Sequence, residues 1–160
     1  MGSRSKTTDY AYIAGFLDGD GSLMLQIKTR SDTKRGARFM ATICLYQDTR
    51  HEKVLVWMHK RLGVGYISRR NDGISELRIN GYMQVRNILQ KLEPFIRFKA
   101  KQTGLLIQAC VLLETKPIAL LSKRELRKLV ALVFDIKDNN YKSGSALTKK
   151  ELCQRLGLTP

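Results

Sequence analysis

Two carboxylates stand close together near the start of the chain, in the sequence Tyr-Ile-Ala-Gly-Phe-Leu-Asp-Gly-Asp-Gly at residues 12–21. Asp18 and Asp20 alternate with Gly19 and Gly21, at the end of a stretch typical of a helix. The C-terminal end of a helix carries partial negative charge, so a carboxylate there is unfavourable unless a cation binds. The pattern fits a metal site, and it also fits a loop with two solvated aspartates.

Hydrophobic periodicity and turn signals predict the elements that must position these carboxylates. We expect a helix over 9–18 with Asp9 as its N-cap and the glycines at its end. Further elements are predicted in the following ranges: strands at 22–30 and 38–47 around a loop at 31–37, a helix at 50–62, strands at 64–70 and 74–79 joined by a tight turn, and helices at 82–91 and about 100–114. This α-β-β-α-β-β-α order predicts an α+β fold, an antiparallel sheet with helices on one face.

The dipeptide Lys116-Pro117 marks a boundary within the chain. Residues 1–115 form the predicted core, and 116–160 form a basic helical C-terminal extension of the same domain. Two capping boxes, Ser122 to Glu125 and Thr148 to Glu151, predict the two helices of this extension.

Alternation within the strands predicts one apolar face, led by Leu23, Leu25 and Phe39, and one face of long polar side chains. Arg pairs with guanine and Gln with adenine in the major groove, where a two-stranded ribbon fits. We therefore expect the polar face to contact nucleic acid, although an ordinary solvated face is the alternative. The candidate residues on this face are Met24, Gln26, Lys28, Arg30, Arg38, Met40, Cys44, Tyr46, Tyr66, Ser68, Arg70, Glu76 and Arg78. Candidate phosphate contacts are Lys34, Arg35, Lys101 and Lys142.

The composition restricts the partners of the chain. With 29 basic and 14 acidic residues among 160, the formal net charge is +15 and the partner is expected to be a polyanion, nucleic acid before an anionic membrane surface. No apolar run is long enough to span a bilayer, and no signal peptide opens the chain. The three cysteines are widely spaced and the histidines number two, which excludes a disulfide framework and a histidine-rich or zinc centre. We expect a reducing, intracellular location.

The segment from Ile13 to Gly21 closely resembles the LAGLIDADG motif. The resemblance covers about residues 8–115 and extends to Gln26-Ile27-Lys28, to residues 63–66 and to residues 94–102. It is nearest to the single-motif homing endonucleases of algal chloroplast and related ribosomal-RNA introns. It implies the homing-endonuclease fold, in which the sheet forms a saddle.

The resemblance also implies a homodimer whose motif helices pack across the two-fold axis. The implied interface comprises Tyr12, Ile13, Ala14, Gly15, Phe16 and Asp18. Asp20 of each subunit would reach the scissile phosphates and bind Mg²⁺ together with the Gly19 carbonyl, a site that Mn²⁺ or Ca²⁺ could also occupy. The implied reaction is hydrolysis of both strands of a long pseudo-palindromic DNA duplex, which promotes intron homing. No membrane partner and no small-molecule cofactor are expected.

Three further positions match the family's supporting catalytic residues. Gln47 matches the position that orders a water near the metal, and Lys99 matches the basic residue that touches the active-site solvent. His51 stands where the family has an arginine, and Arg50 beside it is a possible substitute. Histidine is a weaker, pH-sensitive donor, so this departure leaves room for a relative that binds DNA or RNA without cleaving it. A ribosome-associated RNA-binding domain is the third reading. The host compartment is expected to be an organelle (chloroplast or mitochondrion) or the cytoplasm of an archaeon or bacterium.

Overall fold

The computed structural model of the chain describes residues 5–32, 36–140 and 147–158, and its elements follow the predicted order. Their bounds are α1 Lys6–Asp20, β1 Gly21–Thr29, β2 Ala37–Asp48, α2 Lys53–Leu62, β3 Tyr66–Arg69, β4 Ile74–Asn80, α3 Tyr82–Leu92, α4 Ala100–Thr115, α5 Lys123–Asp138 and α6 Lys149–Arg155. Short 3-10 helices occupy η1 Thr49–His51, η2 Glu93–Phe95 and η3 Ile118–Leu120.

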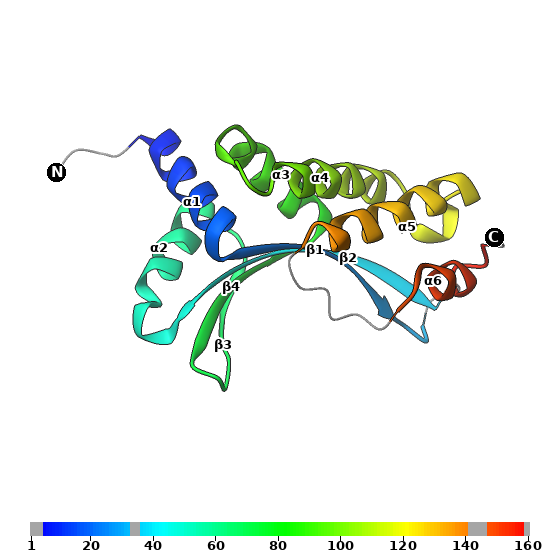
Figure 1. Ribbon diagram of the computed structural model, residues 1–160, viewed down its shortest axis with the longest axis horizontal. Coiled ribbons are helices and arrows are strands. Elements are labelled where there is room, and N and C mark those ends of the chain that lie inside the picture. Colours follow the sequence, from blue (N-terminus) through cyan, green and yellow to red (C-terminus); the bar gives the residue numbers. More distant parts are fainter. Residues whose placement is uncertain (1–4, 33–35, 141–146, 159–160) are drawn as a thin grey trace.

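The four strands form an antiparallel sheet in the order β1-β2-β4-β3. Figure 1 shows α1, α3, α4 and α5 on one side of this sheet, while the strands bend away from them so that the other side is concave. The core lies between the helices and the sheet and includes Leu23, Phe39, Ile43 and Leu45, as the strand alternation predicts. Buried leucines of α5 and α6 belong to the same core.

The first helix begins earlier and ends later than its sequence pattern predicts. Ser5, not Asp9, is the N-cap, and its hydroxyl accepts a hydrogen bond from the Thr8 amide. Asp9 is buried instead and forms an ion pair with Arg61 of α2, at 3.1 Å. Gly19 and Asp20 form the last turn of the helix, so the helix carries the second carboxylate to the edge of the sheet.

Two other expectations are refined. The helix predicted over 50–62 is divided, because Asp48 caps η1 through the Arg50 amide and α2 starts only at Lys53. Both capping boxes of the C-terminal extension are confirmed, since Ser122 and Glu125, and Thr148 and Glu151, exchange side-chain and backbone hydrogen bonds. In the described part of the chain, no helix is both long and apolar enough to cross a membrane.

Candidate nucleic-acid interface

Asp20 is an exposed carboxylate fixed where α1 passes into β1. The amide of Gly21 donates to the carbonyl of Leu17 and closes the helix. A Cβ at position 21 would lie 2.5–2.8 Å from atoms of Leu17, so only glycine allows this sharp junction. The direction of the Asp20 side chain is therefore set by a rigid helix and not by a loop.

Asp18 serves a different purpose from Asp20. Its carboxylate accepts hydrogen bonds from the Arg97 amide at 2.6 Å and the Lys99 amide at 3.0 Å. These bonds tie the end of α1 to the segment that leads into α4. Both carboxylate oxygens are thus engaged within the chain, which does not support the predicted role of Asp18 at the dimer interface.

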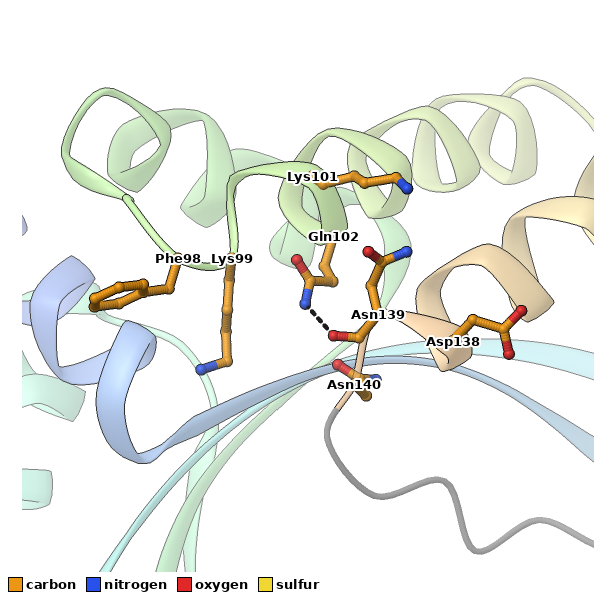
Figure 2. A pocket seen from close by; sticks show the side chains of 7 residues that line it. All are labelled: Phe98, Lys99, Lys101, Gln102, Asp138, Asn139 and Asn140. Atoms are coloured by element: carbon orange, nitrogen blue, oxygen red, sulfur yellow. Dashed lines mark hydrogen bonds between the residues drawn. The ribbon is translucent and has the colours of Figure 1, made fainter.

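Lys99 is a nearly buried cation beside both aspartates. Its amino group donates to the Asp18 carbonyl at 2.5 Å, and the side chain reaches toward the junction of α1 with β1 (Figure 2). Burial lowers the pKa of Lys99, while the nearby charges of Asp18 and Asp20 oppose that effect. The structure therefore brings together Asp20 and Lys99, two of the predicted catalytic residues.

Gln47 lies near the end of β2, at the end of the sheet where β1 begins. The register that pairs Gly21 with Leu45 leaves Gln47 two residues beyond that pair, past the first residue of β1. Its side-chain oxygen accepts from the Asp48 amide at 2.8 Å. His51 is exposed at the end of η1. Arg50 next to it donates two hydrogen bonds to the Asp48 carboxylate. These bonds lower the pKa of Asp48. Arg50 is therefore engaged with Asp48 in this conformation.

A polar cavity of about 520 Å³ adjoins Lys99. Figure 2 shows its lining residues, which are Phe98, Lys99, Lys101, Gln102, Asp138, Asn139 and Asn140. Gln102 donates to the Asn139 carbonyl at 2.7 Å, and Asn140 donates to the Leu23 carbonyl at 3.2 Å. These amides join α4, the end of α5 and β1, a connection that no pattern in the sequence indicates.

The free side of the sheet carries the residues predicted for it. The strand register sets Lys28 opposite Arg38 and Gln26 opposite Met40. In the other half of the sheet, Tyr46 is opposite Glu76, which is opposite Ser68. The same rows contain Ser22 and Asn80, two polar residues that the sequence analysis did not select. Both lie at strand ends, where alternation is read over too few residues to assign a face.

Some predicted contacts need correction. Cys44 lies between Ser22 and Arg78 in the register and has no exposed surface. Its burial also raises the pKa of its thiol. The prediction that Cys44 contacts DNA is therefore wrong for this conformation. Glu76 is almost buried as well. Lys101 is exposed, as a phosphate contact requires. Lys34, Arg35 and Lys142 lie outside the described residues.

The motif helix presents a narrower outer face than predicted. Tyr12 and Gly15 are exposed and Phe16 is half-buried. Ile13 and Ala14 have no exposed surface, because the helical repeat turns them toward the sheet, and their prediction as interface residues is wrong. Gly19, one turn after Gly15, completes the exposed stripe, and a Cβ at either glycine would meet no atom of residues 5–32, 36–140 or 147–158 within 4 Å.

Two aromatic side chains beside α1 are exposed: Tyr12, a predicted interface residue, and Phe98, which was not predicted as a site residue. The Tyr12 ring packs edge-on against Trp57 of α2, with ring centroids 5.5 Å apart. Phe98, in the segment tied to Asp18, is 79% exposed and points toward α1 (Figure 2). Helical periodicity cannot identify Phe98 as an exposed residue, because it assigns each apolar side chain to the core.

Together, the fold and this site define a class of protein. A model of the LAGLIDADG endonuclease family matches residues 13–109, and the chain belongs to that family. It is 33% identical to DNA endonuclease I-CvuI of Chlorella vulgaris over 99 residues, 62% of each chain. It is also 33% identical to DNA endonuclease I-CreI of Chlamydomonas reinhardtii over 97 residues, 61% of this chain and 59% of the relative. The matched part thus spans about three fifths of these relatives' length.

Solved structures agree with the family assignment. The crystal structure of I-CvuI in complex with the I-CreI target, with 2 mM Mg and the DNA not cleaved, superposes with a TM-score of 0.85 at 25% identity, over 97% of this chain and 98% of that chain. An archaeal intron-encoded homing endonuclease, I-Vdi141I complexed with DNA, has the same fold, with a TM-score of 0.83 at 20% identity over 96% and 97% of the two chains. The predicted α+β homing-endonuclease fold is confirmed.

Proposed function

We propose that the chain is a homodimeric, site-specific DNA endonuclease that depends on a divalent metal ion. It hydrolyses phosphodiesters in both strands of a long pseudo-palindromic duplex and so promotes intron homing, in an organelle or a prokaryotic cytoplasm. The observation that carries this proposal is the exposed Asp20 at the end of a rigid helix, beside the nearly buried cation of Lys99.

The surface of the sheet supports DNA as the substrate. Its concave side presents Lys28, Arg38 and Gln26 in neighbouring rows, in a chain of net charge +15. Arg and Gln side chains can read base edges in the major groove, while the lysines favour the phosphates.

The glycines of α1 support a dimer. A glycine in a helix interior destabilises the helix by about 1 kcal/mol relative to alanine. Among the residues that the structure describes, none fills the space beside Gly15 or Gly19, so the packing within one protomer does not require glycine there. A second α1 crossing closely at this stripe does require them. The two Asp20 residues would then face each other across the same DNA.

The residues present fit a site for Mg²⁺ that DNA completes. Among residues 5–32, 36–140 and 147–158, no group of three His, Cys, Asp or Glu side chains could hold a metal ion. Mg²⁺ typically uses one or two carboxylates together with substrate phosphates and water. Asp20 and the Gly19 carbonyl supply protein oxygens for it, and Mn²⁺ or Ca²⁺ suits the same donors.

The chain's own residues divide the remaining work. Bound Mg²⁺ would polarise the scissile phosphate and lower the pKa of a coordinated water. Lys99 holds positive charge at the Asp18–Asp20 end of α1, where negative charge develops on the phosphate. Gln47 hydrogen-bonds a water at the strand end, and His51 donates to the phosphate.

One observation favours a second candidate, a relative that binds nucleic acid without cleaving it. His51 replaces the expected arginine, and Arg50, the possible substitute, pairs with Asp48 and is not free to contact a phosphate in this conformation. The two candidates differ in one measurable property, which is Mg²⁺-dependent cutting of a duplex.

Cleavage-site selection from a randomised duplex library with Mg²⁺ tests the proposal. We expect the wild-type chain to cut a pseudo-palindromic site in both strands. Loss of a residue that only orients a metal ligand typically costs about 10–100-fold in metal affinity or activity, so Asp20→Asn, which changes the proposed ligand itself, is expected to reduce cutting by at least about 100-fold while binding to the selected duplex persists. Binding without cutting by the wild type would favour the second candidate, and cutting by Asp20→Asn would refute the assignment of Asp20.

A further inference from the structure

Arginines on the free side of the sheet are held by carboxylates two residues away. In the turn that follows β1, Arg30 and Asp32 approach to 2.5 Å. In the turn between β3 and β4, Arg70 and Asp72 approach to 2.7 Å. Within β4, Arg78 and Glu76 approach to 3.0 Å. The pattern thus recurs at three places on the surface proposed to read DNA.

The geometry of these pairs matters for base recognition. Glu76 accepts from Nε of Arg78 at 3.2 Å and also lies 3.0 Å from Nη2. Asp32 likewise accepts from Nε and Nη2 of Arg30. Asp32 and Glu76 therefore each hold the Nε–Nη2 side of a planar, forked cation. Asp72 accepts from Nη2 of Arg70 at 2.7 Å, and none of these contacts uses Nη1. The guanidinium recognises guanine through its terminal nitrogens, at the end that points away from the backbone.

Folding stability does not explain the two acids in the turns, Asp32 and Asp72, well. Asp32 and Asp72 are 60% and 50% exposed, and ion pairs this exposed contribute little to stability. On a surface that faces phosphates, each carboxylate also repels the ligand and cancels one positive charge. A nonspecific DNA-binding surface would be stronger without them.

We propose that Asp32, Asp72 and Glu76 are specificity-determining positioning residues. Each acid orients its arginine toward a base edge. The same acid weakens the attraction of that arginine for phosphates of any sequence, so discrimination between bases increases while affinity for nonspecific DNA falls. This inference rests on the proposed DNA recognition by the sheet.

The test selects binding sites from a randomised duplex library, with EDTA present to prevent metal-assisted cleavage. Full-length Asp72→Asn and Asp32→Asn chains are compared with the wild type, and Glu76→Gln is a third variant. For each variant we expect base preference to fall about tenfold at one position per half-site. We also expect unchanged or tighter binding to unrelated duplex, with a salt dependence steeper by about 0.9 for each phosphate newly contacted.

Glu114→Gln is the matched control. It removes the same charge from an ion pair with Arg86 that joins α4 to α3, in the helical layer. We expect its base-preference profile to match that of the wild type. An equal loss of preference in this control would show that net charge is responsible and would overturn the proposal.

A double-variant comparison isolates the action of each acid through its arginine. In an Arg70→Ala background, Asp72→Asn should change the profile no further. A second, independent loss there would overturn the positioning role, as would an unchanged profile in all three single variants. If the wild type selected no duplex at all, the proposed function itself would fail, which is a distinguishable result.

Discussion

At the scale of single residues, two aspartates separated by one glycine do unrelated work. Asp18 accepts two backbone hydrogen bonds from the 97–99 segment, and Asp20 faces outward. The sequence could predict both carboxylates, but it could not separate their roles, because the partners of Asp18 lie about 80 residues further along the chain. The burial of Ile13 and Cys44 is equally a consequence of distant packing.

This difference predicts opposite behaviour from the same substitution two residues apart. Asp18→Asn replaces one acceptor oxygen by a donor, so one of the two amides loses its partner and the free energy of unfolding falls by about 1–3 kcal/mol. Asp20→Asn, at an exposed position, should leave that free energy within about 0.5 kcal/mol of the wild-type value. Urea denaturation of the two variants measures this contrast. Equal stabilities would refute the structural role of Asp18.

At the scale of elements, the sequence predicts the strands and the late helices well. Strand alternation and capping boxes are local patterns, and the sheet and α5 and α6 follow them. The start of α1 is missed because Asp9 pairs with Arg61, which no local pattern shows. The division between η1 and α2 is missed because Asp48 caps η1, and because Glu52 between the two helices is held by Arg69 of β3 and Ser75 of β4, which are distant in sequence.

Glu52 links the start of α2 to that hairpin and predicts a pH dependence of stability. Its carboxylate accepts from Arg69 and from Ser75, and these hydrogen bonds lower its pKa from 4.5 to about 2. A lowered folded-state pKa gives stability that is present above 4.5 and is lost as the pH falls toward about 2. Thermal unfolding should show Glu52→Gln less stable than the wild type at neutral pH, with the difference shrinking across that window. A difference that stays constant down to pH 2 would contradict this account.

At the scale of the whole molecule, one protomer supplies half of the active site that we propose. It offers one exposed acid at the end of α1 and a concave basic sheet on one side of that helix (Figure 1). The proposed cleavage of both strands needs two such acids, and the proposed pseudo-palindromic target needs two such sheets. The net charge of +15 and the motif are evident from the sequence. Which side of α1 faces outward could not be predicted from it, because that depends on the burial of Ile13 and Ala14 in the folded chain.

That outer face gives a prediction in which folding and assembly move in opposite directions. Gly15→Leu removes a helix-interior glycine where a Cβ meets no described residue within 4 Å, so the isolated protomer should gain up to about 1 kcal/mol of stability. The same side chain would keep a second α1 from approaching closely, and sedimentation should show a monomer for this variant and the proposed dimer for the wild type. Gln108→Leu, at an exposed position of α4, adds the same side chain away from α1 and should leave the dimer intact. If Gly15→Leu remains fully dimeric, the protomers meet through a surface other than α1. The proposal that the two Asp20 residues act together on one duplex would then be wrong.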